Sequence, residues 1–203
     1  MPTRLTKIIA TLGPATASRK TIKELVDAGV NVFRLNLSHG DHKALRRRIR
    51  WIRMAEKESK TFLAILLDLQ GPKIRVGKFE KGAITLQRGR CIWSTTESGM
   101  GNDSLVPVQY RQFYKEVEVG GRLSNFKGIN MPDATIRSSP LTPKDKEDLE
   151  FGIGEGVDFV ALSFTGSAKD IQQLRRLIQS KKGDAEIIAK IERKEALSNL
   201  EEI

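Results

Sequence analysis

The chain has 203 residues, and 35 Lys and Arg residues against 25 Asp and Glu residues leave a formal net charge of +10. Apolar residues make up 39% and charged residues 30%, which excludes a membrane protein and argues against wholesale disorder. The single cysteine, Cys91, rules out an intrachain disulfide and a cysteine-based zinc site. Because the amino-terminus leads into no apolar signal segment, we expect a soluble, cytoplasmic protein with no membrane partner.

The first part of the chain alternates apolar runs with amphipathic segments. Residues 7–11 form a β-rich run that Gly13 ends, and residues 19–28 have helical spacing with Gly29 at their end. The pattern then predicts a strand over 30–35, a basic helix over 41–57 and a buried strand over 62–67.

The same order returns in the last third of the chain. Thr142 and Asp145 match a capping box, and Pro143 suits the first helical position, so we expect a helix running towards Gly154. Strands that alternate with helices over short loops indicate βα units and an α/β fold with a parallel sheet. The later elements are predicted as a strand over 159–164, a helix over 168–181, a strand over 186–190 and a helix from residue 194.

Between these two parts the pattern changes. Short alternating pieces such as residues 83–86, frequent glycines and little helical periodicity predict a small inserted β module. We therefore expect a first part over 1–77, an inserted module over 78–126 and a continuation of the first part over 127–203. The five strands outside the insert are too few to close an eight-stranded barrel.

Polar side chains follow the apolar strands at their carboxyl ends, where α/β sheets place active sites. Arg34, Asn36 and Ser38 share one face of the second strand, because strand side chains alternate. Residues 68–75 add a charged stretch directly after a buried strand. The later strand near Ser163 offers that hydroxyl alone, which is a weaker signal.

Lys190 and Glu192 also share a face at the end of a strand. The ammonium can stabilise a phosphoryl group or an enolate, and the carboxylate can hold Mg²⁺, which takes few protein carboxylates beside substrate phosphates. Arg34 and Arg75 add planar donors suited to phosphate. These groups predict a phosphoryl-transfer site, although a solvent-facing ion pair explains Lys190 and Glu192 equally well.

Several of these segments resemble pyruvate kinase, in the same order, and the likeness covers nearly the whole chain. The resemblance implies a partial (β/α)₈ TIM-type barrel, here its first five βα units, with an inserted small β lid. The segments that carry it are 7–16, 34–40, 68–75 and 188–192, with 127–130 and 142–145 resembling the return from the family's inserted domain.

The resemblance implies a glycolytic reaction that moves the phosphoryl group of phosphoenolpyruvate to ADP, giving pyruvate and ATP. By matched position Lys190 stabilises the transition state, Arg34 binds the substrate phosphate and Glu192 binds Mg²⁺ or Mn²⁺. Nucleotide contacts are implied for Asn36, His39, Arg75 and Lys127, and monovalent-cation ligands for Asn36, Ser38 and Asp68.

Three departures from the family affect these expectations. Leu69 and Lys73 stand where potassium-dependent members carry Thr and Glu, so we expect the Lys73 ammonium to replace potassium. The lid is short around residues 118–125, and the chain stops at Ile203, before the family's Arg-Gly-Asp segment with the second metal carboxylate. We therefore expect an amino-terminal part that is inactive or nearly so by itself, with the family's homo-oligomeric assembly in doubt.

Two alternatives remain open at this point. One is an inactive family fragment that keeps weak phosphate and nucleotide binding. The other is a nucleic-acid binder, suggested by the net charge and by the basic residues 46–53. Because Leu45, Ile49 and Ile52 form a packing face on that segment, we expect a solvated outer helix and no nucleic-acid partner.

Overall fold

The computed structural model describes residues 5–38, 41–72, 76–85, 87, 89–108 and 139–203. Four predicted site residues lie outside the described residues, namely His39, Lys73, Arg75 and Lys127. The chain divides into two compact units, one formed by Met1–Gly71 with Ser139–Ile203 and the other by Pro72–Ser138. Every helix in the described part of the chain is too short or too polar to cross a bilayer.

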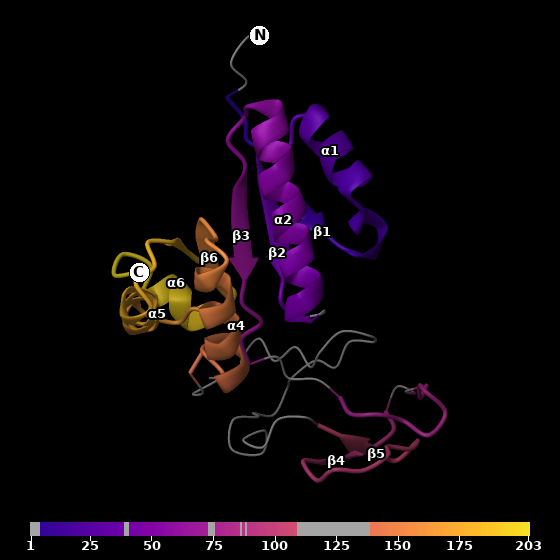
Figure 1. Cartoon of the computed structure of the whole chain (residues 1–203). Coiled ribbons are helices and arrows are strands. Elements are labelled where there is room, and N and C mark those ends of the chain that lie inside the picture. Colours follow the sequence, from indigo (N-terminus) through magenta and orange to yellow (C-terminus); the bar gives the residue numbers. More distant parts are fainter. Residues whose placement is uncertain (1–4, 39–40, 73–75, 86, 88, 109–138) are drawn as a thin grey trace. The chain divides into compact units, whose positions relative to one another are not determined.

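The first unit contains a five-stranded sheet with the strand order β1-β2-β3-β6-β7 (Figure 1). Each neighbouring pair of strands is parallel. The predicted α/β fold with a parallel sheet is therefore confirmed. The strands are β1 (Ile9–Leu12), β2 (Val32–Asn36), β3 (Ala64–Asp68), β6 (Phe159–Leu162) and β7 (Glu186–Ala189).

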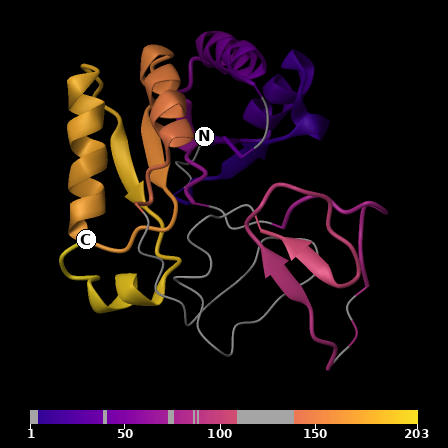
Figure 2. The ribbon, with the colours of Figure 1, turned by 90° about the horizontal axis from the view of Figure 1, so that it is seen from below.

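The longer helices of this unit lie along one face of the sheet (Figure 2). Strands β1, β2, β6 and β7 are each followed by a helix, so the polar turns at their carboxyl ends precede the helices, whereas β3 leads into the second unit. The helical elements are η1 (Pro14–Thr16), α1 (Arg19–Asp27), α2 (His42–Ser59), α4 (Pro143–Gly154), α5 (Ala168–Ser180) and α6 (Lys194–Ser198).

The helix boundaries follow the capping signals. The Asp41 side chain accepts a hydrogen bond from the Ala44 amide at 2.7 Å and starts α2. Thr142 and Asp145 form the predicted capping box, and Pro143 occupies the first helical position of α4. Gly29 follows α1 with φ of 97°, a conformation that glycine adopts without steric cost.

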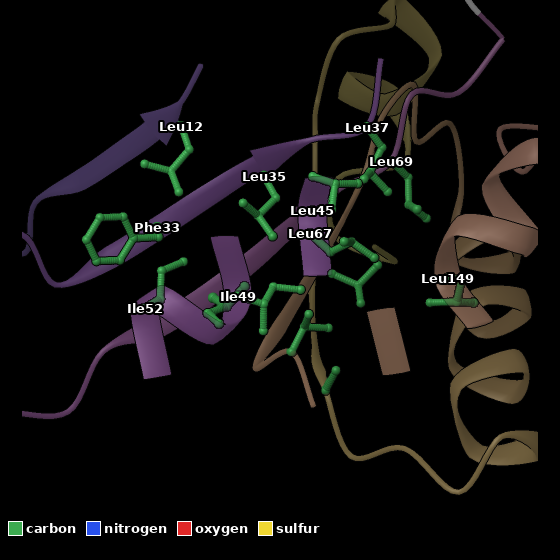
Figure 3. Close-up of a cluster of buried hydrophobic side chains, with 14 of the residues drawn as sticks. Leu12, Phe33, Leu35, Leu37, Leu45, Ile49, Ile52, Leu67, Leu69 and Leu149 are labelled. Atoms are coloured by element: carbon green, nitrogen blue, oxygen red, sulfur yellow. The ribbon is translucent and has the colours of Figure 1, made fainter. Parts of the chain in front are cut away.

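The hydrophobic core lies between the sheet and the helices. Phe33, Leu35 and Leu67 point from the sheet towards α2, where Ile49 and Ile52 meet them (Figure 3). All five side chains are buried, and each such burial contributes about 1.5–3 kcal/mol relative to exposure. Since strand side chains alternate, the residues between these positions lie on the opposite face of the sheet.

The start of β3 differs from the prediction. The apolar run begins at Phe62, but the strand begins at Ala64, and the Phe62 side chain is 95% exposed. Lys60 ends α2 in the left-handed conformation with φ of 52°, and the ladder starts where the Ala64 amide donates to the Asn31 carbonyl. An apolar run does not determine at which residue strand pairing begins.

The second unit contains a two-stranded parallel sheet formed by β4 (Trp93–Thr95) and β5 (Leu105–Pro107). Isolated bridges join Val76 to Val108 and Phe79 to Gly101. The alternating piece at 83–86 contributed to the prediction of a β module, and its described residues 83–85 form no strand. Alternation over four residues without a neighbouring strand of matching register is too weak a signal to decide pairing.

Candidate functional site

The sheet register brings predicted site residues from separate segments to one edge. Asn36 pairs with Asp68, Asp68 with Ala161, and Ala161 with Ile188. Ser163 lies two residues after Ala161, and Lys190 lies two residues after Ile188. Because strand side chains alternate, both side chains lie on the same face of the sheet as Asp68. The carboxyl ends of β2, β3, β6 and β7 therefore present their polar side chains together.

Asp68 lies at the centre of this group. Its side chain is 4% exposed, and its Oδ2 accepts hydrogen bonds from Nε of Arg34 at 2.8 Å and from Nη2 of the same guanidinium. Arg34 also donates from Nη1 to Oγ1 of Thr11, its register partner on β1, at 3.0 Å. The Arg34 side chain is thus held by two neighbouring strands in one orientation.

Lys190 approaches Asp68 from the other side. Its Nζ lies 3.3 Å from Oδ1 of Asp68, 2.8 Å from Oγ of Ser163 and 3.2 Å from Oε1 of Glu192. An ammonium has three N–H donors, and these three oxygens match them. Lys190 and Glu192 therefore form part of a shared network, and the interpretation as an isolated surface ion pair does not describe their surroundings.

Ser163 has a larger part in the site than its sequence signal indicated. The side chain is buried, accepts the hydrogen bond from Lys190, and donates its own proton to the Leu69 carbonyl at 2.6 Å. The observed register explains this part, because Ser163 and Lys190 both lie two residues beyond the paired positions Ala161 and Ile188.

Glu192 is the carboxylate available to a divalent cation. One of its oxygens faces Lys190, and Oε2 accepts a hydrogen bond from the Phe164 amide at 3.0 Å. Its side chain is 37% exposed, which leaves its oxygens accessible. The described residues hold no cluster of three His, Cys, Asp or Glu side chains suited to a metal. A single carboxylate fits Mg²⁺, which completes its shell with water and substrate phosphate oxygens.

The predicted monovalent-cation ligands are engaged within the protein. Oδ1 of Asn36 accepts a hydrogen bond from the Ser38 amide at 3.0 Å, and both oxygens of Asp68 face cationic side chains. The Leu69 side chain is buried in the core cluster. The negative charge at Asp68 is therefore already compensated by Arg34 and Lys190.

The charges of the site balance in this state. Arg34 and Lys190 carry positive charge, and Asp68 and Glu192 carry negative charge, within the distances given above. Both cations remain about one-third exposed, so an arriving phosphate dianion can reach them. Planar guanidinium donors and an ammonium held in fixed positions are suited to binding phosphate and to stabilising charge on it.

The basic helix α2 uses several of its arginines within the fold. Arg46 forms an ion pair with Glu155 and lies 5.5 Å from the ring centroid of Phe151. Arg47 lies over the Trp51 ring. The predicted packing face is confirmed, because Leu45, Ile49 and Ile52 are all buried. These contacts favour a structural helix over a phosphate-binding surface.

The chain matches a family model described as pyruvate kinase, barrel domain, over residues 3–123 and 109–203. It is 40% identical to the pyruvate kinase of Agrobacterium vitis, over 98% of this chain and 47% of that protein. It is 37% identical to pyruvate kinase 2 of Synechocystis sp., over 98% of this chain and 39% of that protein. It is 36% identical to the pyruvate kinase of Thermococcus litoralis, over 100% of this chain and 49% of that protein. The chain thus spans 39% to 49% of the length of these relatives, and it belongs to the pyruvate kinase family.

Proposed function

We propose that this chain carries part of an active site that transfers the phosphoryl group of phosphoenolpyruvate to ADP, giving pyruvate and ATP. The observation that carries this proposal is the convergence of Arg34 and Lys190 on the buried carboxylate of Asp68. Phosphoryl transfer depends mainly on positioning and on charge that is in place before reaction. A pair of cations held at one edge of a sheet supplies both.

Each side chain has a distinct role in this proposal. Arg34 binds the phosphoryl oxygens through its guanidinium group, which Asp68 orients. Lys190 stabilises the negative charge that develops on the transferring group and on the enolate oxygen. Ser163 and Asp68 hold the Lys190 ammonium in place. Arg34 and Lys190 therefore act on the substrate, whereas Asp68 and Ser163 position them.

Glu192 is the proposed ligand for Mg²⁺ or Mn²⁺. When bound, the ion would reduce the charge repulsion that the substrate phosphates present to the site. Asn36 is the described residue proposed to contact the nucleotide, and His39, Arg75 and Lys127 remain predictions for the same role. The charge compensation at Asp68 supports the proposal that potassium is not required, with Lys73 supplying the positive charge.

The fold proposed for this chain is part of a (β/α)₈ barrel, namely the first five βα units with an inserted β lid. The five-stranded parallel sheet, with β1 and β7 at its edges, supports this proposal. An eight-stranded barrel needs three more strands between those edges. Since small displacements of reacting groups are costly, we expect the isolated chain to bind substrate weakly and to turn over little.

A second candidate function is a non-catalytic family fragment that binds phosphate or nucleotide. Among the described residues, β1 and β7 each have a strand partner on one side only, which favours this candidate because binding needs fewer fixed groups than catalysis. Calorimetric titration of the chain with phosphoenolpyruvate and MgCl₂, beside a coupled lactate dehydrogenase assay, separates the two.

The matched variants are Lys190→Met in the site and Lys194→Met at an exposed position, the first residue of α6. The catalytic proposal predicts that a hybrid completed with the missing part of a relative turns over phosphoenolpyruvate, and that Lys190→Met abolishes turnover while Lys194→Met preserves it. A folded hybrid that stays inactive while the chain binds phosphoenolpyruvate supports the second candidate. Absence of binding in the chain and of turnover in the hybrid contradicts both.

A further inference from the structure

Helix α4 carries two buried carboxylates that the proposed chemistry does not use. Asp148 contacts the His42 imidazole at 2.7 Å and forms an ion pair with the Lys144 ammonium. Asp145 is fully buried, and its hydrogen-bond partners in the described part of the chain are all neutral. Burying a carboxylate among neutral partners costs free energy, and the hydrogen bonds that Asp145 accepts have to offset this cost.

The donors that meet Asp145 come from two distant segments. Oδ1 accepts a hydrogen bond from the Gly71 amide at 3.1 Å, and Oδ2 accepts from the Thr142 amide at 2.9 Å and from the Thr142 hydroxyl. An ionised carboxylate offers only acceptors, whereas an asparagine would turn an NH₂ group towards one of these donors. The first turn of α4 also favours a negative charge at this position.

Gly71 is the partner that connects Asp145 to the site. It adopts φ of 65°, and a Cβ at this position would lie 2.8 Å from Cδ2 of Phe164 and 3.3 Å from Cβ of Ser163. Only glycine fits so close to the end of β6 in this conformation. Two residues earlier, the Leu69 carbonyl accepts the Ser163 proton. The exit of β3 therefore packs on Ser163 and also bonds to it.

We infer that Asp145 is a positioning residue that holds Gly71 and the exit of β3 against Ser163, and so fixes the hydroxyl that binds Lys190. Gly71 is also the last residue of the first unit before the insert, and Thr142 lies just after the chain resumes that unit at Ser139. One buried carboxylate thus ties the departing and returning segments together within the first unit. The catalytic consequence rests on the proposed function, but the contact itself does not.

The test compares Asp145→Asn with Asp170→Asn. Asp170 is the capping-box residue of α5, and its Oδ2 accepts from the local amides of Gly166 and Ser167, each at 2.9 Å. We expect Asp145→Asn to speed hydrogen exchange at the Gly71 amide about tenfold, because a buried hydrogen bond is lost. Asp170→Asn should leave Gly71 exchange unchanged and speed exchange at Gly166.

Competitive amine labelling of Lys190 tests the second step. Release of Ser163 should raise the reactivity of Lys190 in Asp145→Asn relative to Asp170→Asn, while the labelling of the other lysines stays the same. Urea unfolding of both variants separates this local effect from a loss of global stability. Unchanged exchange at Gly71, or faster exchange with unchanged Lys190 reactivity, would overturn the inference.

Two further measurements complete the design. If Asp145→Asn does not fold, hydrogen exchange in the unmodified chain tests the inference. The Gly71 amide should then exchange as slowly as the amides of β3. Exchange of the Gly71 amide at the rate of an open loop would overturn the inference. Titration with phosphoenolpyruvate and MgCl₂ reports on the proposed function separately. A chain that fails to bind phosphoenolpyruvate counts against that function, while the Gly71 and Lys190 measurements still decide the role of Asp145.

Discussion

Asp68 and Lys190 lie 122 residues apart in the sequence, yet Nζ of Lys190 is 3.3 Å from Oδ1 of Asp68. They meet because β3 and β7 flank β6 in a parallel sheet, which places their carboxyl ends at one edge. Arg34 reaches the same carboxylate from β2 on the other side. Asp68 is therefore the common partner of both cations proposed to act on the substrate.

Replacing Asp68 by Asn should destabilise the chain. The substitution leaves Arg34 and Lys190 without their shared counter-charge, and we expect a loss of about 1–3 kcal/mol, reduced by the partial exposure of both cations. Urea unfolding at neutral pH measures this change.

Asp27→Asn is the control for this substitution, because Asp27 pairs with Lys23 at 2.7 Å on the exposed face of α1. It should cost less stability than Asp68→Asn, because exposed ion pairs contribute little. Equal losses in the two variants would contradict the central role of Asp68.

Alanine substitutions at two glycines of α4 should change the stability of the chain in opposite directions. At Gly152 a Cβ would lie 2.5 Å from Cδ2 of the buried Leu67, so Gly152→Ala should destabilise by about 1–3 kcal/mol despite its better helix propensity. At Gly154 no atom lies within 4 Å of the Cβ position, and Gly154→Ala should stabilise by about 0.5–1 kcal/mol. Thermal and urea unfolding of both variants check the signs, and stabilisation by Gly152→Ala would show that the packing of α4 on β3 is looser than described.

The chain should bind nucleic acid only weakly and without sequence preference. Arg46 and Arg47 are engaged with Glu155, Phe151 and Trp51, and charge alone provides affinity that salt weakens. Fluorescence titrations with labelled duplexes at low and physiological salt measure this. Tight binding at physiological salt that disappears when residues 46–48 become Ala would reverse the assignment of α2 as a structural helix.

Activity should not depend on potassium in a hybrid completed with the missing part of a relative. One reason is the proposal that the Lys73 ammonium replaces potassium, and the other is that Asp68 already has two cationic partners. The double substitution of Lys73→Glu with Leu69→Thr should create potassium dependence in a coupled assay.

The control for the potassium experiment is Leu69→Thr alone. Because the Leu69 side chain is 1% exposed, this change should cost about 1–3 kcal/mol of stability without creating potassium dependence. Full activation of the unmodified hybrid by added potassium would contradict the proposal.

The sequence by itself determined the order of the elements and the class of fold. Local signals were sufficient for this, because Thr142, Pro143 and Asp145 start a helix through contacts within one turn. Hydrophobic periodicity likewise located the buried face of α2 at Leu45, Ile49 and Ile52. The motif segments indicated the pyruvate kinase family, and the comparisons confirmed it.

Only the tertiary structure decided which of the polar side chains meet. Ser163 and Asp145 carried weak or purely local signals in the sequence, yet Ser163 binds Lys190 and Asp145 binds Gly71, 74 residues away. The exposed Phe62 shows the converse, since an apolar residue of a strand-like run lies outside the ladder. The physical reason is that sheet register and helix placement are global outcomes of packing, so a residue's sequence neighbours specify its local conformation but not its distant partners.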